Sequence, residues 1–134
     1  MNFRIEIEPP TVTAQEKGLQ IVRGKPYFYE KPEVKKAKRQ FLWYLAQNRP
    51  EEPMQGALML KTVWTFKVRG KHKPGEYRIT RPDTDNLVKL FKDCMTKVGF
   101  FQDDSQVAYE ITIKQWGETG SIDVMLSQMK EAEY

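Results

Sequence analysis

Cysteine and histidine are almost absent from this 134-residue chain, which contains one of each, Cys94 and His72. A lone cysteine excludes a disulfide within the chain, and one cysteine with one histidine excludes a closed zinc site of the usual Cys/His kind. Long apolar runs are also missing, since no stretch approaches the roughly 18 residues that cross a membrane as a helix. The start, MNFRIEIEPP, carries charges and lacks an apolar core, so no secretory signal is expected. We therefore expect a cytoplasmic protein that spans no membrane.

Acidic side chains are scarce in two long segments, although the net charge of the whole chain is only +4. Nine Lys/Arg stand against two acids between Lys17 and Arg49, and seven against one between Lys61 and Arg81. From Pro82 onward the balance reverses, with five Lys/Arg against ten acids. This asymmetry predicts a polyanionic partner for the basic part and a cation site in the acidic part, with ordinary solvated faces as the alternative.

Strand and helix patterns are mixed without regular β-α alternation, which predicts an α+β fold in a single domain spanning residues 1–134. We expect a mixed or antiparallel sheet packed against two main helices. Hairpins are expected at 19–30, turning at Arg23–Lys25, and between the last two strands around Gly117–Gly120. The helices are expected at 32–48 and 84–97, the other strands at 3–7 and 58–68, the last two at 107–116 and 121–129, and a frayed tail at 129–134.

Acidic residues occur at both ends of the stretch RPDTDNLVKLFKDCMTKVGFFQDDSQ, residues 81–106. Asp83 and Asp85 begin it, and Asp103 and Asp104 end it. Aspartate at a helix start has an ordinary structural use, because it caps backbone N–H groups and suits the helix dipole. The alternative is a Mg²⁺ site, since that ion prefers carboxylate oxygens. A shared site requires the chain to fold back so that the second pair lies near the first.

Lys89 follows Asp85 by four residues, so both lie on one face of the expected helix. Beside a metal ion, a lysine there could orient water, transfer a proton or offset charge on a phosphate. Alternatively, it pairs with Asp85 on the helix surface.

The stretch RPDTDNLVKLFKDCMTKVGFFQDDSQV resembles the RusA family, Holliday-junction resolvases of bacteria and their phages. The family motif is D-x-D-N, a lysine three residues later, a helix, and then D-D-x-Q. The resemblance implies that Asp83, Asp85 and Asp104 are the catalytic, metal-binding carboxylates and Lys89 the catalytic lysine. It also implies a small α+β fold, a Mg²⁺ cofactor with Mn²⁺ as a substitute, and no organic cofactor. One departure is Pro9-Pro10-Thr11-Val12-Thr13, where many members carry Pro-Pro-Ser-x-Asn.

The implied activity is paired nicking of four-way DNA junctions in recombination and repair by a homodimer. One chain has one such motif and no internal repeat, whereas two symmetric nicks need two sites, which a two-fold dimer supplies. Lysine and arginine would bind the DNA phosphates. The candidates, each with ordinary surface charge as the alternative, are Lys35, Lys36, Lys38, Arg39, Arg69, Lys71, Lys73, Arg78 and Arg81.

Two other functions stay open from the residues themselves: a non-catalytic DNA-binding module whose acids are caps, and a metal nuclease acting on other branched or flapped DNA. The large aromatic side chains Phe41, Trp43, Tyr44 and Trp64 are expected in the core. Phe100 and Phe101 could wedge into a junction, but core or dimer packing is the preferred interpretation. Candidates for the dimer contact are Phe100, Phe101 and Trp116.

Overall fold

The computed structural model describes residues 1–12 and 17–130, so residues 131–134 of the predicted tail, and Thr13, lie outside the described residues. The structure confirms the α+β class. Among these residues, no helix has both the length and the apolar character that a membrane crossing requires. The elements are β1 (Asn2–Ile5), β2 (Lys17–Val22), β3 (Lys25–Glu30), α1 (Pro32–Ala46), β4 (Leu58–Lys67), α2 (Thr84–Val98), the short 3₁₀ helix η1 (Asp104–Gln106), β5 (Val107–Gly117) and β6 (Ser121–Gln128).

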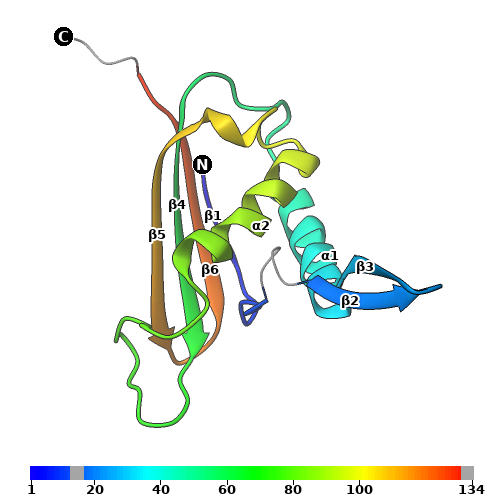
Figure 1. Cartoon of the computed structure of the whole chain (residues 1–134). Helices are drawn as coiled ribbons and strands as arrows, with labels where there is room; N and C mark the ends of the chain where they lie inside the picture. Colours follow the sequence, from blue (N-terminus) through cyan, green and yellow to red (C-terminus); the bar gives the residue numbers. More distant parts are fainter. Residues whose placement is uncertain (13–16, 131–134) are drawn as a thin grey trace.

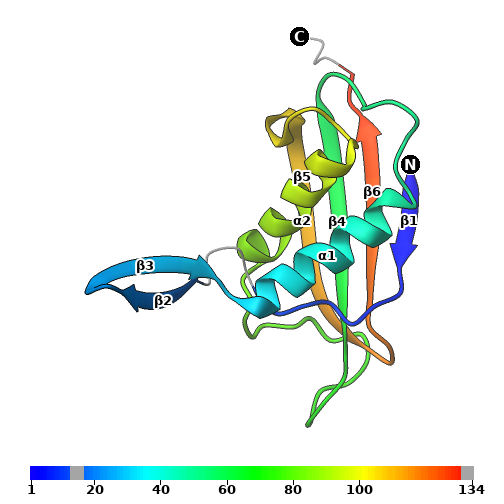
Figure 2. The ribbon, with the colours of Figure 1, turned by 90° about the vertical axis from the view of Figure 1, so that its right-hand side faces the viewer.

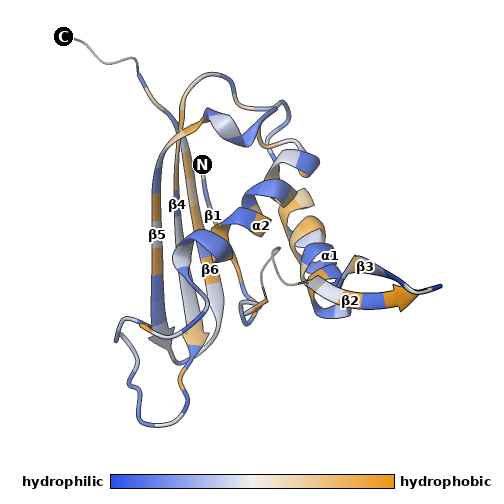
Figure 3. Ribbon diagram, viewed as in Figure 1, coloured by the Kyte–Doolittle hydropathy of each residue, from blue (hydrophilic) through white to orange (hydrophobic). Residues whose placement is uncertain are grey.

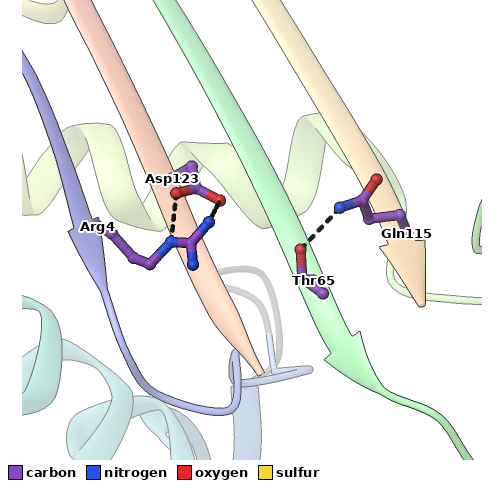
Figure 4. Close-up of polar contacts among 4 residues, drawn as sticks. All are labelled: Arg4, Thr65, Gln115 and Asp123. Atoms are coloured by element: carbon purple, nitrogen blue, oxygen red, sulfur yellow. Dashed lines mark hydrogen bonds and ion pairs between the residues drawn. The ribbon is translucent and has the colours of Figure 1, made fainter. Parts of the chain in front are cut away.

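Four strands form a mixed sheet in the order β1-β6-β4-β5, in which β4 pairs parallel with β5 and antiparallel with β6. Both helices lie on one face of this sheet (Figures 1 and 2). Side chains on the other face join neighbouring strands (Figure 4): the Arg4 guanidinium donates to Asp123 at 2.7 Å, and the Gln115 amide donates to the Thr65 hydroxyl at 3.1 Å. The helices therefore leave one face of the sheet uncovered.

The predicted hairpin between the last two strands is wrong, because β4 lies between β5 and β6. The Gly117–Gly120 connection crosses the end of β4, where the Val68 N–H donates to the Gly117 carbonyl at 2.9 Å. Alternation and turn residues predict that two strands are connected, but they do not determine which strand lies between them. Here β4 takes the place between β5 and β6, and its residues 58–67 are mostly buried.

The first hairpin is confirmed, with β2 and β3 paired antiparallel around Arg23 and Gly24. Both turn residues have positive φ, 52° and 78°, which matches the twist of a tight hairpin. The hairpin projects away from the sheet, with apolar residues on β2 (Figures 2 and 3). Its exposed apolar side chains are Leu19, Ile21, Val22, Tyr27, Phe28 and Tyr29.

Each helix buries one stripe against the sheet. Pro32 occupies the first turn of α1, where its missing N–H costs nothing. Gly99 ends α2 with a φ of 100°, a left-handed conformation that glycine adopts without a Cβ clash. The buried helix residues are Val34, Ala37, Phe41 and Leu45 from α1, and Leu87, Val88, Leu90, Phe91, Cys94 and Met95 from α2.

Two expectations about aromatic residues are corrected. Trp43 is 62% exposed, because it falls on the side of α1 opposite its buried stripe. Phe100, Phe101 and Trp116 are at most 2% exposed within one chain, so they belong to its own core and are not free for a dimer contact. The prediction of core positions for Phe41 and Trp64 is confirmed.

Phe91 lies at the centre of the helix–sheet interface, and its ring meets Phe41 edge-on at 5.1 Å and Trp64 at 5.3 Å between centroids. We expect Phe91→Ala to lower the free energy of unfolding by about 3–5 kcal/mol, because it leaves a cavity in a packed core. Denaturant titration measures this. The control Tyr109→Ala removes an aromatic ring that is 51% exposed and should cost about 1 kcal/mol or less. Equal losses in the two variants would contradict this description of the core.

Candidate active site

Asp83, Asp85 and Lys89 lie together at the start of α2. Asp83 occupies the N-cap position with extended backbone, φ −69° and ψ 150°, yet its side chain accepts no capping hydrogen bond. Asp85 and Lys89 are exposed, and neither forms an ion pair with another residue in the described ranges. Among the described residues, Asp83 therefore does not cap the helix with its side chain, and Asp85 and Lys89 do not form a surface ion pair.

The backbone just before Asp83 is held by two cationic side chains. Lys114 Nζ donates to the carbonyls of Thr80 at 2.8 Å and Pro82 at 2.7 Å. Arg78 donates from Nη2 to the Arg81 carbonyl at 2.6 Å and from Nε to the Thr80 hydroxyl at 3.1 Å. Together these contacts fix the turn that presents Asp83 at the helix start.

The sequence analysis did not identify Lys114 as a residue of the candidate site. Its signal is the two-residue period of β5, since Lys114 and the buried Trp116 share the face that packs toward the helices. Burial lowers the pKa of the Lys114 ammonium, nearby Arg78 lowers it further, and the Asp83 carboxylate acts in the opposite direction. The Lys114 ammonium therefore interacts electrostatically with the Asp83 carboxylate and also forms hydrogen bonds to the backbone that precedes Asp83.

Asp104 lies at the other end of α2, in the short helix η1. Its neighbour Asp103 is the cap of η1: the Asp103 carboxylate accepts from the Ser105 N–H at 2.9 Å, which lowers the pKa of that carboxyl. Gln106 completes the cap and also donates to the carbonyls of Met54 and Gly56, both at 3.1 Å. Within the D-D-x-Q motif, Asp103 and Gln106 therefore have structural roles, and the Asp104 carboxylate is left out of the cap.

We expect Gln106→Ala to lower the free energy of unfolding by about 2 kcal/mol. The Gln106 side-chain amide joins two loops, and its removal leaves several backbone N–H and carbonyl groups without their hydrogen-bond partner. Besides its two donated bonds, Gln106 Oε1 accepts from the N–H groups of Gln102 and Asp103 at 3.0 and 3.1 Å. Urea titration measures the loss. The matched control is Gln102→Ala in the same turn, whose exposed side chain should contribute less than about 0.5 kcal/mol. A wild-type unfolding midpoint for Gln106→Ala would exclude this structural role.

The two acidic ends of the motif are far apart in one chain. α2 has 15 residues and is therefore about 22 Å long, whereas Mg²⁺ binds its oxygens at about 2.1 Å. Among the residues that the structure describes, no group of three or more His, Cys, Asp or Glu is arranged to hold a metal ion. The chain does fold back, but β5 begins near the C-terminal end of α2 and ends near its start. The expected approach of Asp104 to Asp83 is therefore not formed within one chain.

Around Asp104 the chain forms a hollow of about 360 Å³ at the C-terminal end of α2. Acids and cations both line it, including Asp93, Lys97 and Lys38. Lys38 is engaged elsewhere, because its ammonium pairs with Glu30 at 2.6 Å.

Comparison with known proteins gives the same family as the motif. The family model described as Endodeoxyribonuclease RusA matches residues 8–127. The crossover junction endodeoxyribonuclease rusA of Lactococcus phage r1t is 30% identical over 129 residues, which cover 95% of this chain and 97% of that protein. This chain belongs to the RusA family of endodeoxyribonucleases. The expected family and enzyme class are therefore confirmed.

The basic residues of this RusA-family chain divide into two groups. Lys38 is paired with Glu30, and Arg78 is only 6% exposed, with its guanidinium 4.2 Å from the Phe66 ring centre and 4.7 Å from that of Trp116. Both side chains have contacts within the fold. The other candidates for DNA contact are all exposed: Lys35, Lys36, Arg39, Arg69, Lys71, Lys73 and Arg81.

Cys94 is not a nucleophile in this RusA-family chain. It is 1% exposed in the core, and burial raises the pKa of its thiol to about 11. A thiol with that pKa is protonated at neutral pH, and only the thiolate is reactive. The candidate reactive groups of this chain are therefore its carboxylates and lysines.

Proposed function

We propose that this chain is a Mg²⁺-dependent endonuclease that resolves four-way DNA junctions by paired, symmetric nicks in recombination and repair. The observation that carries the proposal is the uncapped Asp83 carboxylate next to Asp85 and Lys89, on the exposed first turns of α2 in a RusA-family chain. The related protein is named a crossover junction endodeoxyribonuclease and comes from a phage. We therefore expect this chain to be encoded by a phage or prophage and to act in the bacterial cytoplasm.

Asp83 and Asp85 fit a hard divalent ion. Mg²⁺ is usually held by one or two carboxylates, with water and substrate phosphate oxygens at its other positions, and Mn²⁺ suits the same ligands. When bound, the ion would supply an activated water and stabilise the leaving oxygen of the phosphodiester. Lys89, one helical turn beyond Asp85, would contribute a positive charge or a proton donor at the phosphate.

Asp104 can join this site only from a second chain, because Asp83 lies at the start of α2 and Asp104 lies beyond the other end of this helix, which is about 22 Å long. We propose a two-fold dimer in which two α2 helices run in opposite directions, so that the partner subunit's Asp104 approaches Asp83 and Asp85. A two-fold axis repeats each contact, and the dimer then has two equivalent sites. Two sites related by a two-fold axis match the two symmetric nicks.

The exposed β2–β3 hairpin is the proposed contact surface for the second copy. Leu19, Ile21 and Phe28 are 58%, 71% and 75% exposed, and a two-stranded hairpin is marginally stable by itself in water. Apolar side chains gathered in this way mark an interaction surface. They take the place of Phe100, Phe101 and Trp116, which are buried in each chain.

A panel of DNA substrates tests the proposed function: a four-way junction, a replication fork, a flap and a linear duplex, each with Mg²⁺, with Mn²⁺ or with a chelator. We expect the junction to be cut much faster than the other substrates, and only with a metal ion. Faster cutting of flaps or forks would show a nuclease for other branched DNA. Equal junction binding with and without metal ions, together with no nicking, would show a non-catalytic DNA-binding module.

We expect Lys89→Ala to lower the single-turnover cleavage rate by roughly 100-fold or more, the range of positioned acid–base and electrostatic groups. The control is Lys130→Ala, which removes an exposed lysine outside the motif and outside the proposed sites. Binding of Mn²⁺ to the Lys89 variant, followed by its paramagnetic signal, should stay unchanged. Equal cleavage rates for the two variants would remove Lys89 from the site.

A further inference from the structure

A cavity of about 410 Å³ lies between α1, the segment after β1 and the ends of β4 and β5. Two acids and four cations line it. The acid Glu8 is engaged by the fold, because both its carboxylate oxygens accept the Lys67 N–H at 3.1 Å. The second acid is Glu33. The cations are Lys36, Lys67, Arg69 and Arg78.

Arg78 is the unusual member of this set, because its guanidinium is buried without an acidic partner among the described residues. Its hydrogen bonds go to the Thr80 hydroxyl and the Arg81 carbonyl and use Nε and Nη2. A guanidinium has five N–H donors, so others remain available. Burial lowers the pKa of Arg78, the nearby Arg69 lowers it further, and the Glu8 carboxylate acts in the opposite direction without a direct ion pair. A buried cation in this situation is stabilised by an anion.

Trp116 is a second unsatisfied donor beside the same cavity. Its side chain is 2% exposed, and its indole N–H has no acceptor among the described residues. By contrast, the equally buried Trp64 donates its indole N–H to the Thr62 hydroxyl at 2.8 Å. His72 stacks on the Trp116 ring with 4.5 Å between centroids. A buried donor without an acceptor costs about 1–3 kcal/mol. An acceptor oxygen bound beside the Trp116 indole N–H would remove this cost.

We infer that this cavity is a binding subsite for a backbone phosphodiester of the DNA strand, an inference that rests on the proposed function. A phosphodiester supplies both missing elements, a negative charge for Arg78 and acceptor oxygens for the donors around it. The cavity is larger than a phosphate group needs, and its apolar wall of Pro9, Pro10, Val12 and Ala37 suits an attached sugar.

The position of Arg78 gives this subsite a consequence for catalysis. The same guanidinium that faces the cavity donates to the Arg81 carbonyl, two residues before Asp83. The Arg78 guanidinium would therefore contact both a phosphate bound in the cavity and the turn that carries Asp83. Arg78 would act as a positioning residue that sets the distance along the DNA strand between a held phosphate and the phosphodiester at Asp83.

The indole N–H signals in a ¹H–¹⁵N NMR spectrum test the subsite directly, without any cleavage. The chain has three tryptophans, and Trp116→Phe identifies one signal by its loss. Two probes are titrated separately: a thymidine dinucleotide, which carries one phosphodiester, and inorganic phosphate. We expect the dinucleotide to move the Trp116 signal saturably, while the Trp64 signal stays in place. A Trp116 signal that neither probe moves would overturn the inference, and a response to inorganic phosphate alone would show a free-anion site unrelated to DNA.

Two neighbouring lysines provide a matched pair of charge-removing variants. Lys36 lines the cavity and Lys35, also exposed on α1, does not. We expect Lys36→Gln to weaken the dinucleotide titration several-fold and Lys35→Gln to leave it unchanged. Equal effects would mean general charge attraction and would also overturn the subsite. Junction cleavage by the unmodified chain is measured in parallel. If the chain cleaves junctions but the dinucleotide does not shift the Trp116 signal, only the subsite is contradicted. If the dinucleotide shifts the signal but no junction is cleaved, the proposed function is contradicted.

Discussion

We expect Asp83→Asn and Asp85→Asn each to lower the rate of junction cleavage by roughly 1,000-fold or more, within the range of positioned catalytic groups, while junction binding is retained. Asparagine keeps the size of the side chain and is as good an N-cap as aspartate, so the helix start should be preserved. It removes the negative charge that a hard cation requires. Loss of activity with intact folding and binding is therefore the expected pattern.

Single-turnover cleavage and gel-shift titration on the same four-way junction measure this prediction. The control is Glu118→Gln, which removes an exposed acid in the Gly117–Gly120 connection and should leave both quantities unchanged. Cleavage at the wild-type rate by either aspartate variant would remove that residue from the metal site. Equal loss in the Glu118 variant would mean that the rate reports overall charge.

Mixing two inactive variants should restore cleavage if each site draws on two chains. In a heterodimer of Asp83→Asn and Asp104→Asn chains, one site carries both substitutions. The other site combines the intact Asp83 of one chain with the intact Asp104 of the other. We therefore expect that co-refolded mixture to recover up to about half of the wild-type nicking per heterodimer, because one of two equivalent sites is intact.

The control mixture combines Asp83→Asn with Asp85→Asn. Both substitutions lie at the same end of α2, so every site of that heterodimer has one damaged carboxylate and cleavage should not return. The active heterodimer has one working site and should make single nicks without resolving the junction. Full activity of Asp104→Asn alone would exclude Asp104 from the site. Inactivity of the Asp83/Asp104 mixture, despite formation of heterodimers, would place all catalytic groups within one chain.

Local features of the fold were predictable from the sequence because they depend on near neighbours along the chain. The stripe from Leu87 to Met95 predicted the length and buried face of α2, and Pro32 predicted the start of α1. The turn at Arg23–Lys25 was also found from its glycine and the alternation around it.

Features that depend on distant parts of the chain were not predictable in the same way. The neighbours of β5 depend on which strand takes the sheet centre, and alternation does not encode that. The burial of Arg78 depends on the Phe66 and Trp116 rings, which come from two different strands. The family motif identified Asp83, Asp85 and Asp104, but the direction of β5 decides that they lie at opposite ends of α2. Their placement at opposite ends of one helix therefore had to come from the structure.

A cruciform extruded from a supercoiled plasmid tests the central claim most directly, namely that two equivalent metal sites cut one junction in pairs. A first nick releases the supercoiling and lets the cruciform be reabsorbed, so linear product forms only when the second nick follows within the lifetime of the same complex. With Mg²⁺ we expect linear plasmid as the main product, and with a chelator no product. Nicked circles without linear plasmid, or cleavage that persists in the chelator, would contradict paired cutting by two metal-dependent sites.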